Sequence, residues 1–345
     1  MNKKSIIWVD CAKIFACICV VLGHLYMSMS KAGWVSNAAS YYCLPKQTLY
    51  CFHIQIFFVC SGYLYQEFRK DTSIKGHLKN CYSKLIILGV PYFVFSSITL
   101  LLKNVFSGSV NSKATPIFET LFIKPIAPYW FLFVLFFFFL LIPSVNSKIK
   151  LFVIFVITLV CKLLVIFSPI ELPYLVSLAG NHAIWFVIGM VITTVKFRFN
   201  IIEKVLCIIA CLSGLSLCFV FFRSIHAKNW IEFLITALLV LSFVYIFIWI
   251  TKDGRWANAS KLRKYILPVF LMHTIFAATF RSVLLKVGVH SLGIHIIVGA
   301  IVSFVLPMLV YKFVENKWYL LIFIEPIKAW RMRKDKSEVF VERDK

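Results

Sequence analysis

Long, nearly uninterrupted runs of apolar residues dominate the sequence, and most charged residues fall between them. A run of about 18 or more apolar residues is long enough to cross the hydrocarbon core of a bilayer as a helix. Within lipid, a helix also satisfies its own backbone hydrogen bonds. The runs therefore predict an all-α, polytopic integral membrane bundle of about ten transmembrane helices. We expect these helices at residues 6–29, 49–66, 83–103, 129–143, 151–168, 175–195, 203–222, 230–250, 265–285 and 292–313.

Composition agrees with this pattern and excludes a soluble domain. Hydrophobic residues make up 61% of the 345 residues and charged residues only 15%, so little of the chain is suited to face water. Several cysteines lie inside the apolar runs without the paired spacing of metal ligands, and we interpret them as small core residues. These are Cys17, Cys19, Cys161, Cys207, Cys211 and Cys218. The sequence accordingly predicts no metal site.

The positive charge predicts orientation rather than nucleic-acid binding. The formal net charge is +23, but the cations stand beside apolar runs of bilayer length. Cytoplasmic loops are enriched in Lys and Arg. On one side the cations gather at residues 3–4, 69–79, 148–150, 196–204, 252–264 and after residue 313. We therefore expect a multi-pass protein of the inner (plasma) membrane with both termini cytoplasmic.

The same pattern sets the expected organisation of the chain. The longest outer connections should be residues 30–48 and 104–128. Residues 1–320 are expected to form one transmembrane domain, followed by a basic cytoplasmic tail over 321–345 that is frayed at the surface. No small-residue cleavage site follows the basic amino terminus, so we expect it to be retained as the first helix.

Three ionisable side chains lie on one stripe of the first predicted helix. Asp10, Lys13 and His24 are separated by three and eleven residues, which at about 100° per residue places them within about 60° of one another. Ionisable groups inside a bilayer are costly, so each is a functional candidate. The alternatives are that Asp10 and Lys13 form an interfacial pair and that His24 is a hydrogen-bonded core histidine.

The segments around these residues resemble a known family. The segment "VDCAKIFACICVVLGH" at residues 9–24 is similar to the opening of the acyltransferase 3 family of membrane O-acyltransferases, with Lys13 where Arg is commoner. The segments "FHIQIFFVCSGYLY" at 52–65 and "KNCYSKLIILGVPY" at 79–92 resemble the next two helices of that family, although Cys81 and Lys84 replace its paired arginines. The segments "PYWFLFVLFFF", "HAIWFVIGM" and "ILPVFLMH" extend a weaker likeness, and the fucose 4-O-acetylase-like branch is the most similar.

This resemblance implies transfer of an acyl group from cytoplasmic acetyl-CoA to a sugar hydroxyl. It assigns catalysis to His24, as general base or transient acyl carrier, together with Asp10 and Lys13. His24 should lie about 16 Å outward of Lys13 at 1.5 Å rise per residue, which suits an extended pantetheine arm. The expected acceptor-binding residues at the outer level are His53, Trp130 and His182. At the inner level, cations for the donor phosphates are expected at Lys79, Lys84, Lys261 and Arg263.

We therefore predict a membrane O-acetyltransferase that modifies a surface polysaccharide or its lipid-linked sugar precursor. Its cosubstrate would be acetyl-CoA, and it would lie in the lipid bilayer beside polysaccharide-assembly proteins. We expect it to bind neither a metal nor nucleic acid. Lys162 and Arg281, near helix ends, are expected to snorkel, and Ser61 and Gly62 to let helices pack closely.

Two other functions are compatible with the same helices. One is a proton-coupled solute transporter, because buried His and Lys side chains also build proton pathways. Transporters commonly consist of two related halves, and no such repeat is found in this sequence. The other is a catalytically silent membrane partner of a polysaccharide synthase.

Cysteine labelling in intact cells tests the orientation. A thiol reagent that cannot cross the membrane is expected to label Ser36→Cys and Ser109→Cys, which the Lys and Arg bias assigns to the outside, but not Ser337→Cys. Labelling at position 337 in sealed cells would contradict the topology.

Overall fold

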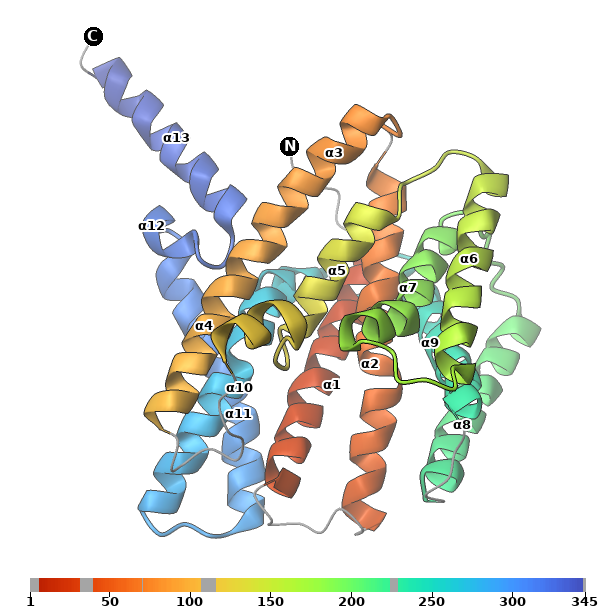
Figure 1. The fold of residues 1–345 in the computed structure, drawn as a ribbon, viewed down its shortest axis with the longest axis horizontal. Helices are drawn as coiled ribbons and strands as arrows, with labels where there is room; N and C mark the ends of the chain where they lie inside the picture. Colours follow the sequence, from red (N-terminus) through yellow and green to blue (C-terminus); the bar gives the residue numbers. More distant parts are fainter. Residues whose placement is uncertain (1–5, 32–39, 70, 107–115, 224–228, 344–345) are drawn as a thin grey trace. The chain divides into compact units, whose positions relative to one another are not determined.

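The computed structural model describes residues 6–31, 40–69, 71–106, 116–223 and 229–343, and within these ranges the chain is helical without β-strands (Figure 1). Nine helices in the described ranges are long and apolar enough to cross a membrane. This confirms the predicted all-α, polytopic bundle. Ser36 and Ser109 lie outside the described residues, as does the side chain of Ser337, so the topology stays a prediction.

The predicted helix over residues 129–143 is shorter than a bilayer span. It corresponds to α5 (Trp130–Leu141), which has 12 residues. At 1.5 Å per residue such a helix is about 18 Å long, against about 30 Å of hydrocarbon. Pro128 and Pro143 flank this helix and account for its length, since proline is disfavoured inside a helix.

The described part of the chain divides into two compact units, of which the first comprises residues 1–72 and 142–266. Its helices are α1 (Ile7–Lys31), α2 (Ser40–Phe68), α6 (Lys148–Phe167), α7 (Tyr174–Ile192), α8 (Ile201–Arg223) and α9 (Asn229–Thr251), followed by the 3₁₀-helix η4 (Ala257–Leu262). Helix α2 packs against α1, α7, α8 and α9 and is the central helix of this unit (Figure 1).

The second unit comprises residues 73–141 and 267–345. It contains α3 (Ile74–Lys84), the π-helix η1 (Leu85–Gly89), α4 (Val90–Val105), the π-helix η3 (Glu119–Ile123), α5, most of α10 (Arg263–Lys286), α11 (Leu292–Val314), α12 (Trp318–Leu321) and α13 (Pro326–Arg343). Within it, α5 packs against α3 and η1.

The third membrane helix begins earlier than the sequence predicts. It starts at Ile74 rather than at residue 83 and runs without a break to Val105. Ser73 caps its start by accepting a hydrogen bond from the Gly76 N–H at 3.0 Å. Pro91 has no N–H for the carbonyl of Ile87 and would crowd it, which accounts for the wide π-helical turn over residues 85–89.

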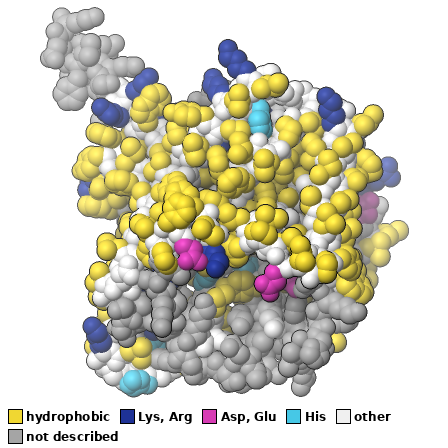
Figure 2. Space-filling model, viewed as in Figure 1, with side chains coloured by type: hydrophobic (Ala, Val, Ile, Leu, Met, Phe, Trp, Pro, Cys, Tyr) yellow, Lys and Arg dark blue, Asp and Glu magenta, His cyan; other side chains and the backbone are white. Residues whose placement is uncertain are grey.

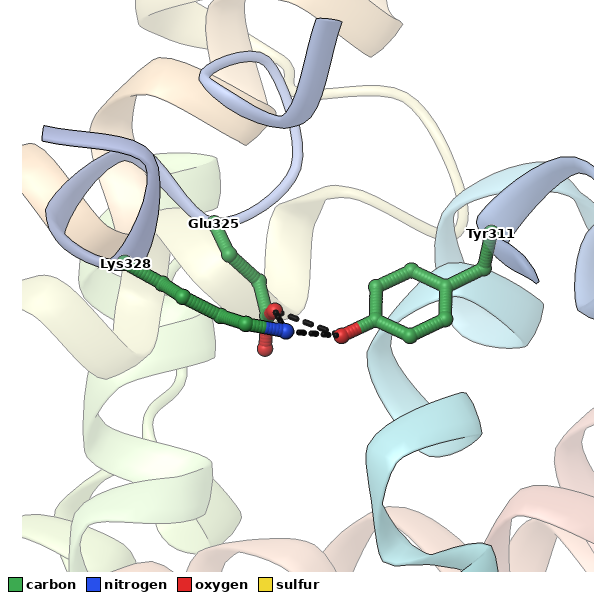
Figure 3. A network of polar contacts seen from close by, with 3 residues as sticks. All are labelled: Tyr311, Glu325 and Lys328. Carbon is green, nitrogen blue, oxygen red and sulfur yellow. Dashed lines mark hydrogen bonds and ion pairs between the residues drawn. The ribbon is translucent and has the colours of Figure 1, made fainter. Parts of the chain in front are cut away.

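The basic tail is helical rather than frayed. In Figure 3, the Tyr311 hydroxyl donates to Glu325 Oε2 at 2.7 Å and accepts from Lys328 Nζ at 3.0 Å, while Lys328 pairs with Glu325 at 3.3 Å. Tyr311 is fully buried, so this network fixes the start of α13 to α11.

Exposed apolar side chains cover much of the coloured, described surface in Figure 2. Many belong to spanning helices, including Phe152 and Leu164 on α6 and Val220 on α8. A water-soluble protein rarely exposes so much continuous apolar surface, whereas lipid accommodates it. These surfaces fit a bilayer environment.

Two glycines allow α2 and α7 to pack backbone against backbone. A Cβ atom at Gly62 would lie 1.8 Å from the Phe186 carbonyl oxygen, and one at Gly189 would lie 2.0 Å from the Val59 carbonyl oxygen. Gly62 therefore packs as predicted, and Gly189 is its counterpart on α7. Small residues at such contacts are what lets membrane helices approach closely.

Gly62→Ala is expected to force α7 away from α2 and to destabilise the protein by about 1–3 kcal/mol, the usual cost of overpacking. Thermal unfolding of purified protein in detergent should show a lower midpoint. Gly293→Ala is the control, because the nearest atom to its Cβ would be 4.0 Å away. Equal midpoints for Gly62→Ala and the unaltered protein would contradict the close contact.

Candidate active site

His24 contacts an aromatic ring on the neighbouring helix. The His24 and Tyr50 ring centroids are 6.1 Å apart with an edge-on arrangement of 74°. Gly23 makes room for this, since a Cβ there would lie 3.1 Å from Tyr50 Cε2. Tyr50 was not identified from the sequence, although it stands two residues before the segment that resembles the family.

Tyr50 also contacts His53, one turn further along α2. Their ring centroids are 4.9 Å apart at 78°, so Tyr50 lies between two imidazoles from α1 and α2. His53 is 1% exposed, and its Nδ1 is hydrogen-bonded to the Leu49 carbonyl. Because a carbonyl only accepts, this bond assigns the proton of neutral His53 to Nδ1 and leaves Nε2 as an acceptor.

His182 lies on α7 against the same central helix. Its ring stacks on Phe58 of α2, with centroids 5.2 Å apart and planes at 29°. His53 and Lys162 are both within electrostatic range of His182. The first unit therefore holds His24, His53 and His182. Tyr50 joins His24 to His53, and His182 lies against the same helix α2 through Phe58.

Lys162 is half-buried and bonds a side chain of the neighbouring helix, a partner that the expected snorkelling did not include. Its Nζ donates to Asn181 Oδ1 at 2.7 Å and lies 5.4 Å from the centre of the Phe233 ring. The Asn181 amide in turn donates to Ser177 Oγ at 3.4 Å. The sequence did not reveal this partner because Asn181 is 19 residues away on another helix.

At the amino-terminal end of α1, Asp10 pairs with a cation from α10. Asp10 is 5% exposed, and its Oδ2 lies 3.8 Å from Nη1 of Arg263. Both Asp10 and Lys13 are within electrostatic range of Cys60 on α2. The sequence placed Arg263 at the level of Asp10 and Lys13, and the structure brings Arg263 to Asp10 itself.

Of the remaining predicted site residues, Lys261 lies on η4 in the first unit, and the others belong to the second unit. Lys84 Nζ lies 4.2 Å from the centre of the Phe139 ring, Lys79 is exposed, and Trp130 is the first residue of α5. The neighbouring Tyr129 is fully buried, and its hydroxyl bonds the Leu271 carbonyl and Thr99 Oγ1, each at 2.9 Å. Tyr129 thus fixes the start of α5 within this unit.

Two further residues of the second unit depart from sequence reasoning. Arg281 is 7% exposed and therefore buried, whereas the sequence predicted only that it snorkels. His273 was not singled out, although it ends the segment "ILPVFLMH". It is 1% exposed, its Nδ1 bonds the Val269 and Phe270 carbonyls, and Ser303 Oγ donates to its carbonyl. These bonds suit a histidine that stabilises α10.

Among the described residues, no group of three or more His, Cys, Asp or Glu side chains is arranged to hold a metal ion. The chemistry available in the first unit is instead that of imidazole nitrogens, a phenol and paired charges. Neutral imidazoles serve as proton acceptors or as nucleophiles.

Comparison with known proteins identifies the family. Neither the curated proteins nor the solved structures contain a match to this chain. The family model described as an acyltransferase domain, that of the acyltransferase 3 family, matches residues 6–312, nearly the whole chain. This range includes the Gly-His segment of α1 and, of the nine candidate spans found in the described residues, all but the last two residues of the ninth. The chain therefore belongs to the acyltransferase 3 family and is a multi-pass membrane acyltransferase.

Proposed function

We propose that this acyltransferase is an O-acetyltransferase. It moves the acetyl group of cytoplasmic acetyl-CoA to a hydroxyl of a surface polysaccharide or of its lipid-linked sugar precursor. It acts in the inner membrane with both termini and the tail over residues 321–345 in the cytoplasm, beside polysaccharide-assembly proteins. The observation that carries the proposal is the contact series His24–Tyr50–His53, which joins the histidine of the Gly-His segment to a second, buried histidine.

Two chemical routes are open to His24. As general base, it takes the proton of the acceptor hydroxyl while that oxygen attacks the thioester carbonyl. The thiolate of coenzyme A then leaves and receives the proton, giving an acetyl ester and a free thiol. As acyl carrier, its imidazole nitrogen attacks the thioester and releases coenzyme A, and the acceptor hydroxyl then displaces the imidazole.

The other residues act by position and charge. We assign Asp10 and Lys13 to the catalytic set at the end of α1 where Arg263 supports Asp10. His53 and His182 bind the acceptor, because the buried His53 and the half-buried His182 each carry an imidazole with hydrogen-bonding capacity for sugar hydroxyls. Trp130 in the second unit is a further acceptor contact. Lys79 and Lys84 supply positive charge to the donor phosphates.

Replacement of His24 tests the chemistry. His24→Ala is expected to lower transfer of labelled acetyl from acetyl-CoA to glycan by about a hundredfold or more, the usual contribution of a general base. Abundance and membrane insertion should stay near normal. Tyr50→Phe should keep most activity, because the phenyl ring preserves both ring contacts.

The matched control for this test is His290→Ala, which removes an exposed histidine outside the proposed site. Activity of His24→Ala within a fewfold of the unaltered protein would assign His24 to packing alone. A transporter would incorporate no labelled acetyl even in the unaltered protein.

Replacement of Lys84 tests donor binding. Lys84→Ala is expected to raise the apparent KM for acetyl-CoA several-fold and to spare turnover at saturation, because a point charge toward phosphate is lost. Lys84→Arg should restore most of the affinity, since arginine keeps both the charge and the contact with Phe139. Lys75→Ala, an exposed lysine on the same helix, is the control. An unchanged acetyl-CoA dependence in Lys84→Ala would make Lys84 a topology signal only.

A further inference from the structure

A cavity of ≈ 440 Å³ lies in the first unit where α8 begins and α9 ends. These two ends meet because α8 and α9 pack against each other. The lining includes Lys204, Trp249, Lys252, Asp253, Arg255 and Trp256. None of these residues has a role in the function proposed above.

The cavity combines positive charge with indole rings. Of the described residues that line it, three carry a positive charge and one a carboxylate. Lys204 Nζ lies 5.1 Å from the centre of the Trp249 ring, so this cation and this ring stand together. Arg255 Nη2 lies 4.0 Å from Asp253 Oδ2, and both side chains are largely exposed. Exposed ion pairs of this kind are weak. The lining therefore suits an anionic ligand with an aromatic part.

The loop that carries Trp256 is held in an unusual conformation. Trp256 has φ 65° and ψ 11°, in the left-handed region that bulky residues avoid, and Gly254 before it has φ 74°. Despite its size, the Trp256 side chain is 63% exposed. Strained backbone of this kind recurs at ligand sites, where the surrounding structure maintains it. Here it presents an indole beside the cavity without burying it.

The position of this loop connects it to the candidate active site. It leads directly into η4, which packs against α1, and then into Arg263, which pairs with Asp10. All of these residues belong to the first unit. A ligand in the cavity would thus be bound at the end of the unit where Asp10 and Lys13 lie.

We propose that this cavity binds the adenosine 3′,5′-bisphosphate end of coenzyme A. The indoles of Trp249 and Trp256 stack on the adenine, and Lys204, Lys252 and Arg255 bind the 3′-phosphate of the nucleotide. A phosphate on a lipid headgroup shares the anionic chemistry, but it has no ring for the two indoles. The inference rests on the proposed function, because it takes the donor to be a coenzyme A thioester.

A comparison of acetyl-CoA with acetyl-pantetheine, which lacks the nucleotide, isolates this contact. Trp256→Ala and Arg255→Gln are each expected to lower kcat/KM for acetyl-CoA about tenfold, the size of one stacking or phosphate contact. The value for acetyl-pantetheine should not change, whereas a folding defect would lower both. Trp256→Phe should retain most of the acetyl-CoA preference. Lys148→Gln, which removes an exposed lysine of the same unit far from the loop in sequence, is the control.

Binding of adenosine 3′,5′-bisphosphate to detergent-purified protein, measured by calorimetry, gives a second readout that needs no catalysis. The unaltered protein should bind it, and Trp256→Ala should bind it about tenfold more weakly. Binding of phosphatidylglycerol that depends on Trp256 while the bisphosphate does not bind would overturn the assignment in favour of a lipid site.

The outcomes separate this inference from the function on which it rests. Normal transfer from acetyl-CoA with unchanged donor preference in Trp256→Ala and Arg255→Gln would overturn the cavity assignment and leave the O-acetyltransferase proposal intact. Absence of transfer from acetyl-CoA by the unaltered protein would overturn the proposed function instead.

Discussion

The backbone contact between α2 and α7 is the constraint on which the candidate active site depends. At Gly62 and Gly189 neither helix has room for even one additional carbon, so their separation and register are fixed. Helix α2 carries His53 and α7 carries His182, and the ring of His182 reaches Phe58 only because the helices are this close. A shift of α7 would change the surroundings of His182 together with those of Asn181 and its partner Lys162.

Lipid around the bundle explains why the ionisable groups occur where they do. A charge inside a bilayer is costly unless protein groups replace water, and three of the cations discussed above meet such a group. Lys162 meets the Asn181 amide, Lys84 meets the face of Phe139, and Arg263 meets Asp10. The Asp10–Arg263 pair is long and its cation half exposed, so it contributes more to positioning α1 against the start of α10 than to stability.

The first unit separates two kinds of chemistry along α1. Near the amino-terminal end are Asp10, its partner Arg263 and, through η4, the loop beside the cavity. Fourteen residues later, about 21 Å along the helix, His24 contacts Tyr50. A pantetheine arm is extended and uncharged, so it is suited to connect an anionic end at one level with a thioester at the other. The proposed transfer requires these two levels, one for the anionic end of the donor and one for the thioester, and α1 carries residues at both.

The sequence by itself determined the all-helical membrane architecture, the stripe of Asp10, Lys13 and His24, and the family. It could do so because bilayer thickness fixes the length of an apolar run, and because a helical stripe depends only on spacing along one segment. It failed at residues 74–79, where lysines suggested a loop although Ser73 caps a helix. Only the tertiary structure gave Asp10 its partner Arg263, Lys162 its partner Asn181 and Gly62 its counterpart Gly189. These pairs join residues far apart in sequence, and their contacts follow from how helices pack, which no spacing along the chain encodes.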